Sequence, residues 1–211
     1  MVERRQDPHE LTIELSPPRA ERADAARNRA HALEVAAHLF ARRGVAAVTM
    51  DEIAAEAGVG KGTLYRRFGD KGGLASALLG ERERALQQQM ISGPAPIGPG
   101  ADPIDRLVAF VEAYLLLALD NIELLEMSET NSPGARFRSG AHSLWVTHCR
   151  ILLDAAGAAN ADVRAQVLMA ALAAEQLRHW TEDEDRDPDE LARSLAELAR
   201  SLAGHRPRTA R

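Results

Sequence analysis

Residues 49–71 read TMDEIAAEAGVGKGTLYRRFGDK, and this stretch specifies the local structure of the N-terminal third of the chain. Thr49, with Glu52 three residues later, forms a capping box that starts a helix whose buried stripe is Met50, Ile53, Ala54 and Ala57. Gly58 supplies a tight turn, and a short second helix follows it. Two helices joined in this way predict a helix-turn-helix.

The second helix of this motif has an apolar inner side and a polar outer side. Val59, Leu64 and Phe68 recur at helical spacing and are expected to pack inward. The outer side carries small, polar and basic residues: Gly60, Lys61, Thr63, Tyr65, Arg66 and Arg67. Because arginine can grip a guanine edge and threonine can contact a thymine methyl or a phosphate, this side predicts contact with the major groove of DNA.

Two further positions flank this helix. Thr49 and Lys71 lie at the starts of the helices before and after it. Helix starts offer free N–H groups and a positive dipole, so both ends suit the binding of a phosphate.

Charge is distributed unevenly along the 211 residues. The net charge is −5, but residues 19–85 alone carry about +3 and residues 86–211 about −6. A basic segment on an acidic chain can be oriented by the field of DNA without binding phosphate indiscriminately. The overall acidity therefore does not exclude a nucleic-acid partner.

Several classes of protein are disfavoured. No run of eighteen apolar residues predicts a membrane span, and residues 1–20 lack the apolar core of a secretory signal. Cys149 is the only cysteine, which excludes an internal disulfide and suits a reducing cytoplasm, where we expect the protein. With no phosphate loop, nucleophile elbow or strand pattern, an enzyme is not expected.

The periodicity predicts an all-α fold of about nine helices in two parts. We expect a flexible arm at residues 1–20, a helix-turn-helix domain at 21–70 and a coupling helix at 71–91. A proline- and glycine-rich linker at 92–101 precedes a second domain at 102–211. Its expected segments are a helix from Pro103, a short segment at 121–128, a loop at 131–140, and helices at 141–156, 162–181 and 187–203.

The last two predicted helices, about residues 162–203, carry broad stripes of leucine and alanine. The final helix places Leu191, Leu195, Leu198 and Leu202 beside a row of alanines. One interpretation is an intramolecular core. The alternative is a homodimer interface built as a four-helix bundle, which we favour because two-fold dimers read palindromic sites.

The helix-turn-helix closely resembles that of the TetR family of bacterial transcription regulators. The matching residues follow the end of the first helix at 36–44 and are Thr49, Ile53, Ala54, Ala57, Gly58, Val59, Gly62, Thr63, Leu64, Tyr65, Phe68 and Lys71. The resemblance is specific over about residues 25–80 and architectural beyond residue 90. It implies phosphate contacts from Thr49, Tyr65 and Lys71, and base-edge contacts from Lys61, Gly62, Thr63 and Arg66 or Arg67.

This chain departs from the family pattern in two places. Gly69 stands where proline is frequent, and Gly72 and Gly73 stand where acidic helix formers are common. Because each glycine in a helix costs roughly 1 kcal/mol relative to alanine, we expect a loosely held start of the fourth helix. Separately, four arginines lie at or just before the first helix: Arg19, Arg22, Arg27 and Arg29. They are either solvent-exposed residues at the start of that helix or part of an arm that reaches the minor groove of DNA.

The second domain holds most of the aromatic and polarisable side chains. They are Phe110, Tyr114, Met127, Phe137, Trp145, His148, His179 and Trp180. They either fill the core or line an apolar pocket for a small molecule, as the family resemblance implies. Glu175 and His179 share a helix face, but without further ligands we expect no metal, and no cofactor.

Together these features predict a dimeric, DNA-binding transcription regulator. We expect a ligand-responsive repressor that binds a palindromic operator and is released by a small, largely apolar molecule. The alternative is a regulator without an effector, or an activator.

Overall fold

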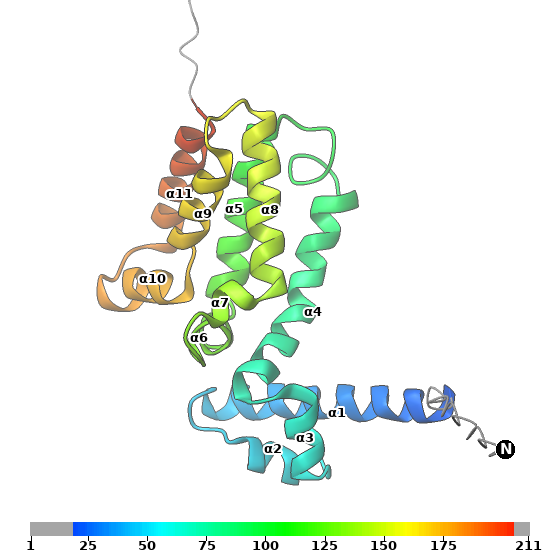
Figure 1. Ribbon diagram of the computed structural model, residues 1–211. Helices are drawn as coiled ribbons and strands as arrows, with labels where there is room; N and C mark the ends of the chain where they lie inside the picture. The colour runs from blue at the N-terminus through cyan, green and yellow to red at the C-terminus, as the bar shows by residue number, and fades with distance from the viewer. Residues whose placement is uncertain (1–18, 205–211) are drawn as a thin grey trace, which may run out of the picture.

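The structure is a computed structural model that describes residues 19–204, and helices are the only regular secondary structure in that range (Figure 1). It contains eleven α-helices and one π-helical turn, which confirms the all-α class. The count exceeds the expected nine because two short helices arise in segments that were predicted as a loop and as part of a longer helix. In the described range, none of the helices has both the length and the apolar character needed to cross a membrane.

The first three helices form a compact unit, which we call the head. They are α1 (Arg19–Arg43), α2 (Met50–Glu56) and α3 (Lys61–Phe68). The capping box of α2 is present: Glu52 N donates to Thr49 Oγ1 at 3.2 Å, and Thr49 N donates to Glu52 Oε2 at 2.8 Å. These bonds to Thr49, together with Arg43, lower the pKa of Glu52 to about 2. Ile53 and Leu64 are buried between the helices, as the sequence predicts.

Helix α4 (Lys71–Ser92) leaves the head and runs into the rest of the molecule. Its first turn is tightly packed, so the expectation of a loose start is wrong. A Cβ atom on Gly73 would lie 1.8 Å from the carbonyl oxygen of Phe68, and one on Gly72 would lie 2.2 Å from the Asn131 amide nitrogen. Both glycines permit a close approach that no larger residue allows.

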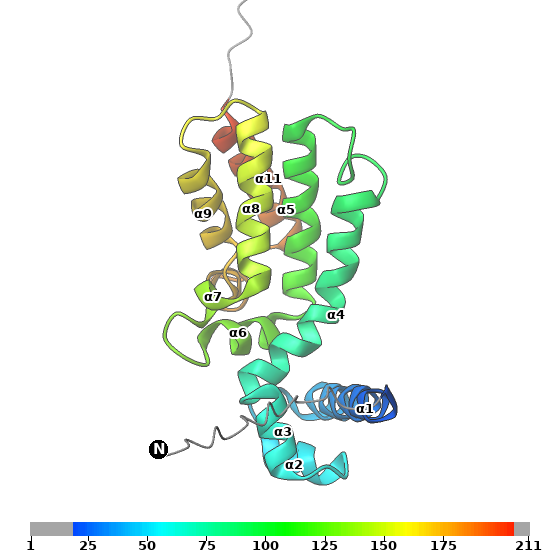
Figure 2. The same ribbon diagram turned by 45° about the vertical axis from the view of Figure 1, so that its right-hand side comes forward.

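The remaining helices form the body, which stands above the head in Figures 1 and 2. They are α5 (Pro103–Leu119), α6 (Ile122–Thr130), α7 (Ala135–Arg138), α8 (Gly140–Ala155), α9 (Ala161–Ala171), α10 (Ala174–Arg178), the π-helical turn η1 (His179–Asp183) and α11 (Pro188–Ala203). Helix α5 packs against both α8 and α11, and α6 packs against α4. The predicted N-caps Asp102 and Asp187 accept backbone N–H bonds at the starts of α5 and α11.

The helix predicted over residues 162–181 is broken at Leu172 and Ala173, so that prediction is wrong. Neither glycine nor proline marks the break; side chains from other helices replace the missing helical hydrogen bonds. The Glu129 carboxylate accepts from Ala174 N at 2.9 Å, and Arg136 donates to the carbonyl of Met169. These partners satisfy the backbone groups that the break exposes.

The leucine and alanine stripes of α11 lie mainly inside one subunit. Leu191, Leu195, Ala196, Ala199 and Ala203 are buried, and α11 packs chiefly on α5. Leu198 and Leu202 are only partly buried. The intramolecular interpretation therefore accounts for most of this helix.

The predicted arm at residues 1–20 lies almost wholly outside the described residues. Of the arginines near it, Arg27 pairs with Asp24 on α1, and Arg29 lies 5.8 Å from the centre of the Phe68 ring. Both are thus engaged within the head.

The body core contains two buried titratable side chains, the Cys149 thiol and the His148 imidazole. Cys149 is fully buried, and this burial raises its pKa to about 12, which disfavours the reactive thiolate. His148 packs edge-on against Phe110 at 5.2 Å, and its Nε2 atom is buried with no partner in the described part of the chain. Burial, and to a smaller extent Arg106, lower the pKa of His148 to about 4.

We predict that His148→Leu reduces the acid sensitivity of the fold. Because the folded pKa is about 4 and the ordinary value is 6.5, the unfolded chain takes up the proton first as pH falls from 6.5 to 4. Stability is therefore lost across that window in the wild type, and less is lost in the variant. Melting temperatures at pH 7 and pH 5 measure the difference, with exposed His38→Gln as the control. An unchanged slope in His148→Leu would contradict the assignment.

Candidate nucleic-acid interface and effector cavity

Helix α3 lies at the outer end of the head, on the side away from the body (Figures 1 and 2). Leu64 faces inward and is 2% exposed, whereas the predicted contact residues are exposed. Those exposed residues are Gly60, Lys61, Gly62, Thr63, Tyr65, Arg66 and Arg67. The structure thus brings the predicted recognition residues together on one solvent-facing surface, with Thr49 exposed at the start of α2.

The basic residues on α3 differ in how they are engaged. Lys61 Nζ pairs with Asp51 at 2.5 Å, and Arg67 donates to the carbonyl of Ala25 at 2.5 Å. Arg67 therefore ties α3 to α1. In the described residues, Arg66 makes no hydrogen bond or ion pair, so its guanidinium is available for a base or a phosphate. Tyr65 is 45% exposed beside it in sequence.

Lys71 has a structural role that its sequence position does not reveal. Its Nζ donates to the carbonyls of Val45, Ala46 and Val48 at 3.0–3.1 Å. All three ammonium donors are used to hold the loop between α1 and α2. Any phosphate contact from this position therefore comes from the backbone at the start of α4, or requires Lys71 to exchange partners.

Two polar contacts join the head to α6 of the body. At the start of α6, Glu123 Oε2 accepts a 2.7 Å hydrogen bond from Val45 N. Just beyond its end, the Asn131 amide donates to both Asp70 carboxylate oxygens at 3.0 Å. Since Val45 follows α1 and Asp70 caps α4, any displacement of α6 acts on the head at both points.

Four of the predicted effector residues form one aromatic cluster. Phe110, Tyr114, Trp145 and His148 have neighbouring ring centres 5.2–5.9 Å apart. Phe110, Tyr114 and Trp145 are almost completely buried, and burial raises the pKa of Tyr114. Tyr114 and Trp145 line a small cavity of about 20 Å³.

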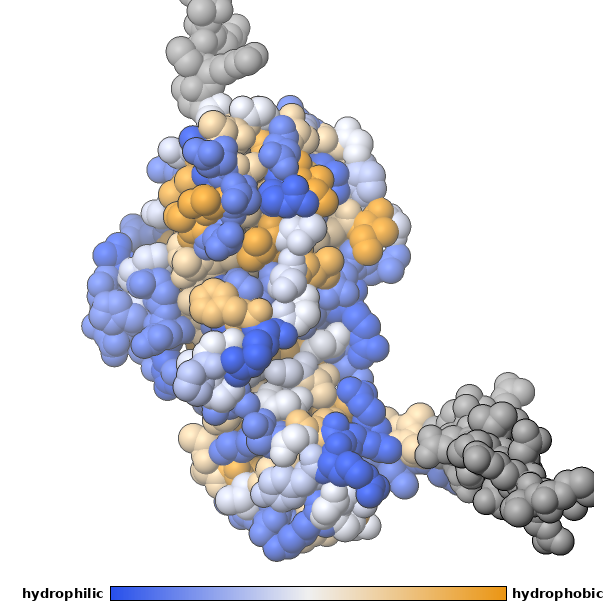
Figure 3. All heavy atoms as spheres, viewed as in Figure 1, coloured by the Kyte–Doolittle hydropathy of each residue, from blue (hydrophilic) through white to orange (hydrophobic). Residues whose placement is uncertain are grey.

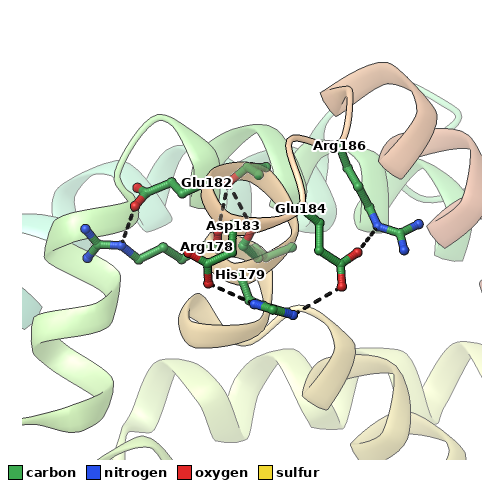
Figure 4. A network of polar contacts seen from close by, with 8 residues as sticks. Arg178, His179, Glu182, Asp183, Glu184 and Arg186 are labelled. Carbon is green, nitrogen blue, oxygen red and sulfur yellow. Dashed lines mark hydrogen bonds and ion pairs between the residues drawn. The ribbon is translucent and has the colours of Figure 1, made fainter.

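The other four predicted effector residues lie outside this cluster. Phe137 is 75% exposed on α7, and Met127 packs partly buried against the core. Trp180 is half-buried in η1. His179 belongs to a surface network with Asp183 and Glu184, which Figure 4 shows beside the Arg178–Glu182 pair; its hydrogen bond to Asp183 raises its pKa.

Sequence reasoning missed the charged residues of the cavity: Glu83, Glu129 and Arg136. Glu83 could have been found, because it interrupts the buried stripe of Leu79, Leu86 and Met90 on α4 at helical spacing. Glu129 and Arg136 carry no such signal. Among residues 19–204, no group of three or more potential ligands is placed to hold a metal ion.

The head, with α3 exposed at its outer end, has the architecture of a helix-turn-helix. Residues 32–78 match the family "Bacterial regulatory proteins, tetR family". Over these residues the chain is similar to this family of transcription regulators.

Individual relatives match between 25% and 86% of the chain. An uncharacterised helix-turn-helix transcriptional regulator of Mycobacterium tuberculosis is 31% identical over 101 residues, which are 48% of each chain. One from Staphylococcus aureus is 49% identical over 53 residues, 25% of this chain and 29% of its own. The chain thus spans about half the length, or less, of these relatives. A TetR-family regulator structure from Pectobacterium atrosepticum has a TM-score of 0.61 at 24% identity, covering 86% of this chain and 96% of its own.

We predict that Lys71→Met destabilises the head. The substitution removes the donor shared by three carbonyls, and loss of a charge-assisted hydrogen bond typically costs about 1.5–3 kcal/mol. Urea unfolding measures the change, with exposed Lys61→Met as the control because its surface ion pair contributes little. Unchanged stability with weakened DNA binding would instead assign Lys71 to phosphate contact alone.

Proposed function

We propose that the protein is a ligand-responsive transcriptional repressor, which acts in the cytoplasm and binds a palindromic operator as a homodimer. The observation that carries the proposal is the exposed face of α3, where Thr63, Tyr65 and Arg66 stand free of the core. Two such helices, related by a two-fold axis and about 34 Å apart, would enter successive major grooves. Bound there, the dimer would block access to a promoter.

Release from the operator would be transmitted through α6. This helix lines the small cavity with Leu125, Ser128 and Glu129, and it contacts the head through Glu123 and Asn131. A molecule that enlarges the cavity would displace α6 and change the spacing of the two heads. It can shift operator binding only by its difference in affinity for the two states.

For the dimer we propose a surface on α8 and α9. Large apolar side chains are exposed there: Leu144 and Ile151 on α8, and Val163 and Val167 on α9. Figure 3 shows apolar surface over this half of the body. The outer side of α11 is polar by contrast, with Arg193, Ser194 and Glu197 exposed. The proposed interface shares α9 with the interface expected at residues 162–203 and contains α8 in place of α11.

The oligomeric state of surface variants tests this interface. Ile151→Glu and Val167→Glu should each shift the protein towards monomer, because a charge would be buried in an apolar contact. Ser194→Glu on α11 should leave the dimer intact. Sedimentation velocity over a concentration series measures the distribution. Dissociation by Ser194→Glu but not by Ile151→Glu would favour the last two helices instead.

Operator binding tests the regulator itself. Starting from DNA selected from a random pool, we expect Arg66→Ala to weaken specific binding by about 1–3 kcal/mol, and Thr63→Ala to weaken it less. Arg66 is preferred to Arg67 because Arg67 also holds α1. Arg84→Ala is the matched control, because the Arg84 side chain is exposed on α4. Fluorescence anisotropy measures the affinity and its salt dependence. Equal losses of affinity in Arg84→Ala and Arg66→Ala would refute the proposed interface.

A regulator without a small-molecule effector is the second candidate. The observation that favours it is the cavity volume of about 20 Å³, which is less than even a small ligand needs. An activator would use the same head. Transcription from an operator-linked promoter, with and without the protein, separates activation from repression.

A further inference from the structure

A surface groove adjoins the small cavity of the body. The groove has a volume of about 360 Å³ and is lined by α4, the end of α6 and the start of α8. Groove and cavity share Glu83, Ser128, Ser139 and Ala141 as lining residues. Three of these four side chains are small, so little separates the two spaces, and Glu83 lies at their boundary.

Glu83 is buried without a counter-charge. It is 7% exposed, and among residues 19–204 no hydrogen bond or ion pair to its carboxylate is present. Burial is the main cause that raises the pKa of Glu83, and Glu129 adds to this, whereas a contact with the Trp145 indole N–H lowers it. That contact falls short of hydrogen-bond geometry, since no acceptor in the described residues is placed to bond Trp145 Nε1. The indole is uncharged, so Glu83 has no counter-charge, and a buried charge is costly unless something pairs with it.

The charges around the cavity do not balance. Glu129 and Arg136 neutralise each other at 2.6 Å, and both are 11% exposed. His142 is neutral at pH 7, because burial lowers its pKa to about 4. Of the residues that line the groove or the cavity, Glu83 is the only carboxyl or guanidinium group without a partner of opposite charge. An ionised Glu83 therefore has no positive partner at this site.

The aromatic side chains beside Glu83 suit the apolar part of a cationic ligand. Tyr114 and Trp145 stand edge to face at 5.9 Å, and Phe110 lies against both. Aromatic faces attract cations as well as apolar groups. A single carboxylate next to an aromatic wall is thus complementary to an ammonium ion that carries an aryl or alkyl group.

We propose that the effector is a monocationic amphiphilic amine, whose ammonium group pairs with Glu83 and whose apolar part displaces the aromatic side chains that now close the cavity. The proposal rests on the effector-responsive function above and assigns its ligand class. Binding would separate α4 from α6 and α8, the helices that bound the groove. Since α6 holds the head through Glu123 and Asn131, this separation gives the amine a route to operator release.

The test uses three soluble probes of nearly equal size and different charge: 2-phenylethylamine, 2-phenylethanol and phenylacetate. The protein has two tryptophans, so Trp180→Phe leaves Trp145 as the single fluorophore at the site. We expect a saturable change in Trp145 fluorescence with the amine, and binding of the alcohol and the acid that is weaker by about tenfold or more.

Glu83→Gln in the same background should weaken amine binding by about tenfold or more and abolish the preference over the alcohol. Glu81→Gln, which alters an exposed acid two residues away on α4, should bind the amine as before. The ligand-free melting temperature should stay equal or rise in Glu83→Gln, because an unpaired buried carboxyl is removed. A purely structural Glu83 would instead lower it.

Three results would overturn the proposal: binding of the alcohol as tight as that of the amine, unchanged amine binding in Glu83→Gln, or no response to the amine or to the larger cation tetraphenylphosphonium at millimolar concentration. Operator release by a neutral or anionic compound would also overturn it, while leaving the repressor function intact. Amine binding without any specific DNA binding would overturn the repressor function instead.

Discussion

The buried ion pair between Glu129 and Arg136 is the contact on which the body depends. Its 2.6 Å bond joins α6 to α7, and each partner also bonds the broken backbone between α9 and α10. Removing one partner of such a pair typically costs about 3–5 kcal/mol, because it leaves an uncompensated buried charge. The pair therefore fixes where α9 ends, how α10 begins and where α6 lies beside the cavity.

Helix α6 is organised around three glutamates spaced three residues apart. Glu123 accepts from the loop after α1, Glu126 pairs with Arg178 of α10, and Glu129 pairs with Arg136. A nine-residue helix would be marginal in isolation, so these contacts and its packing on α4 hold it in place. Because one short helix contacts the head, the cavity and α10, a small movement of it has consequences in all three.

The sequence by itself determined the helix-turn-helix and the order of most helices. Capping residues such as Thr49 and Asp187 act on N–H groups within three residues, and apolar spacing shows which side of a helix is buried. These signals are local, so they survive without knowledge of the fold. They were sufficient for the all-α class, for the exposed face of α3 and for the similarity to the TetR family over residues 32–78. They also placed Phe110, Tyr114 and Trp145 in one candidate site.

The tertiary structure alone decided how distant groups are paired. The ammonium of Lys71 holds a loop that ends more than twenty residues earlier. The Glu129 carboxylate accepts a hydrogen bond from Ala174 N, where the helix predicted over residues 162–181 is broken. Such contacts join residues far apart in sequence, and neither spacing nor composition encodes their geometry. The tertiary structure also decided that Glu83 has no counter-charge, because this depends on all the side chains that surround it. Sequence showed an acid in an apolar stripe, and only the packing showed that nothing neutralises it.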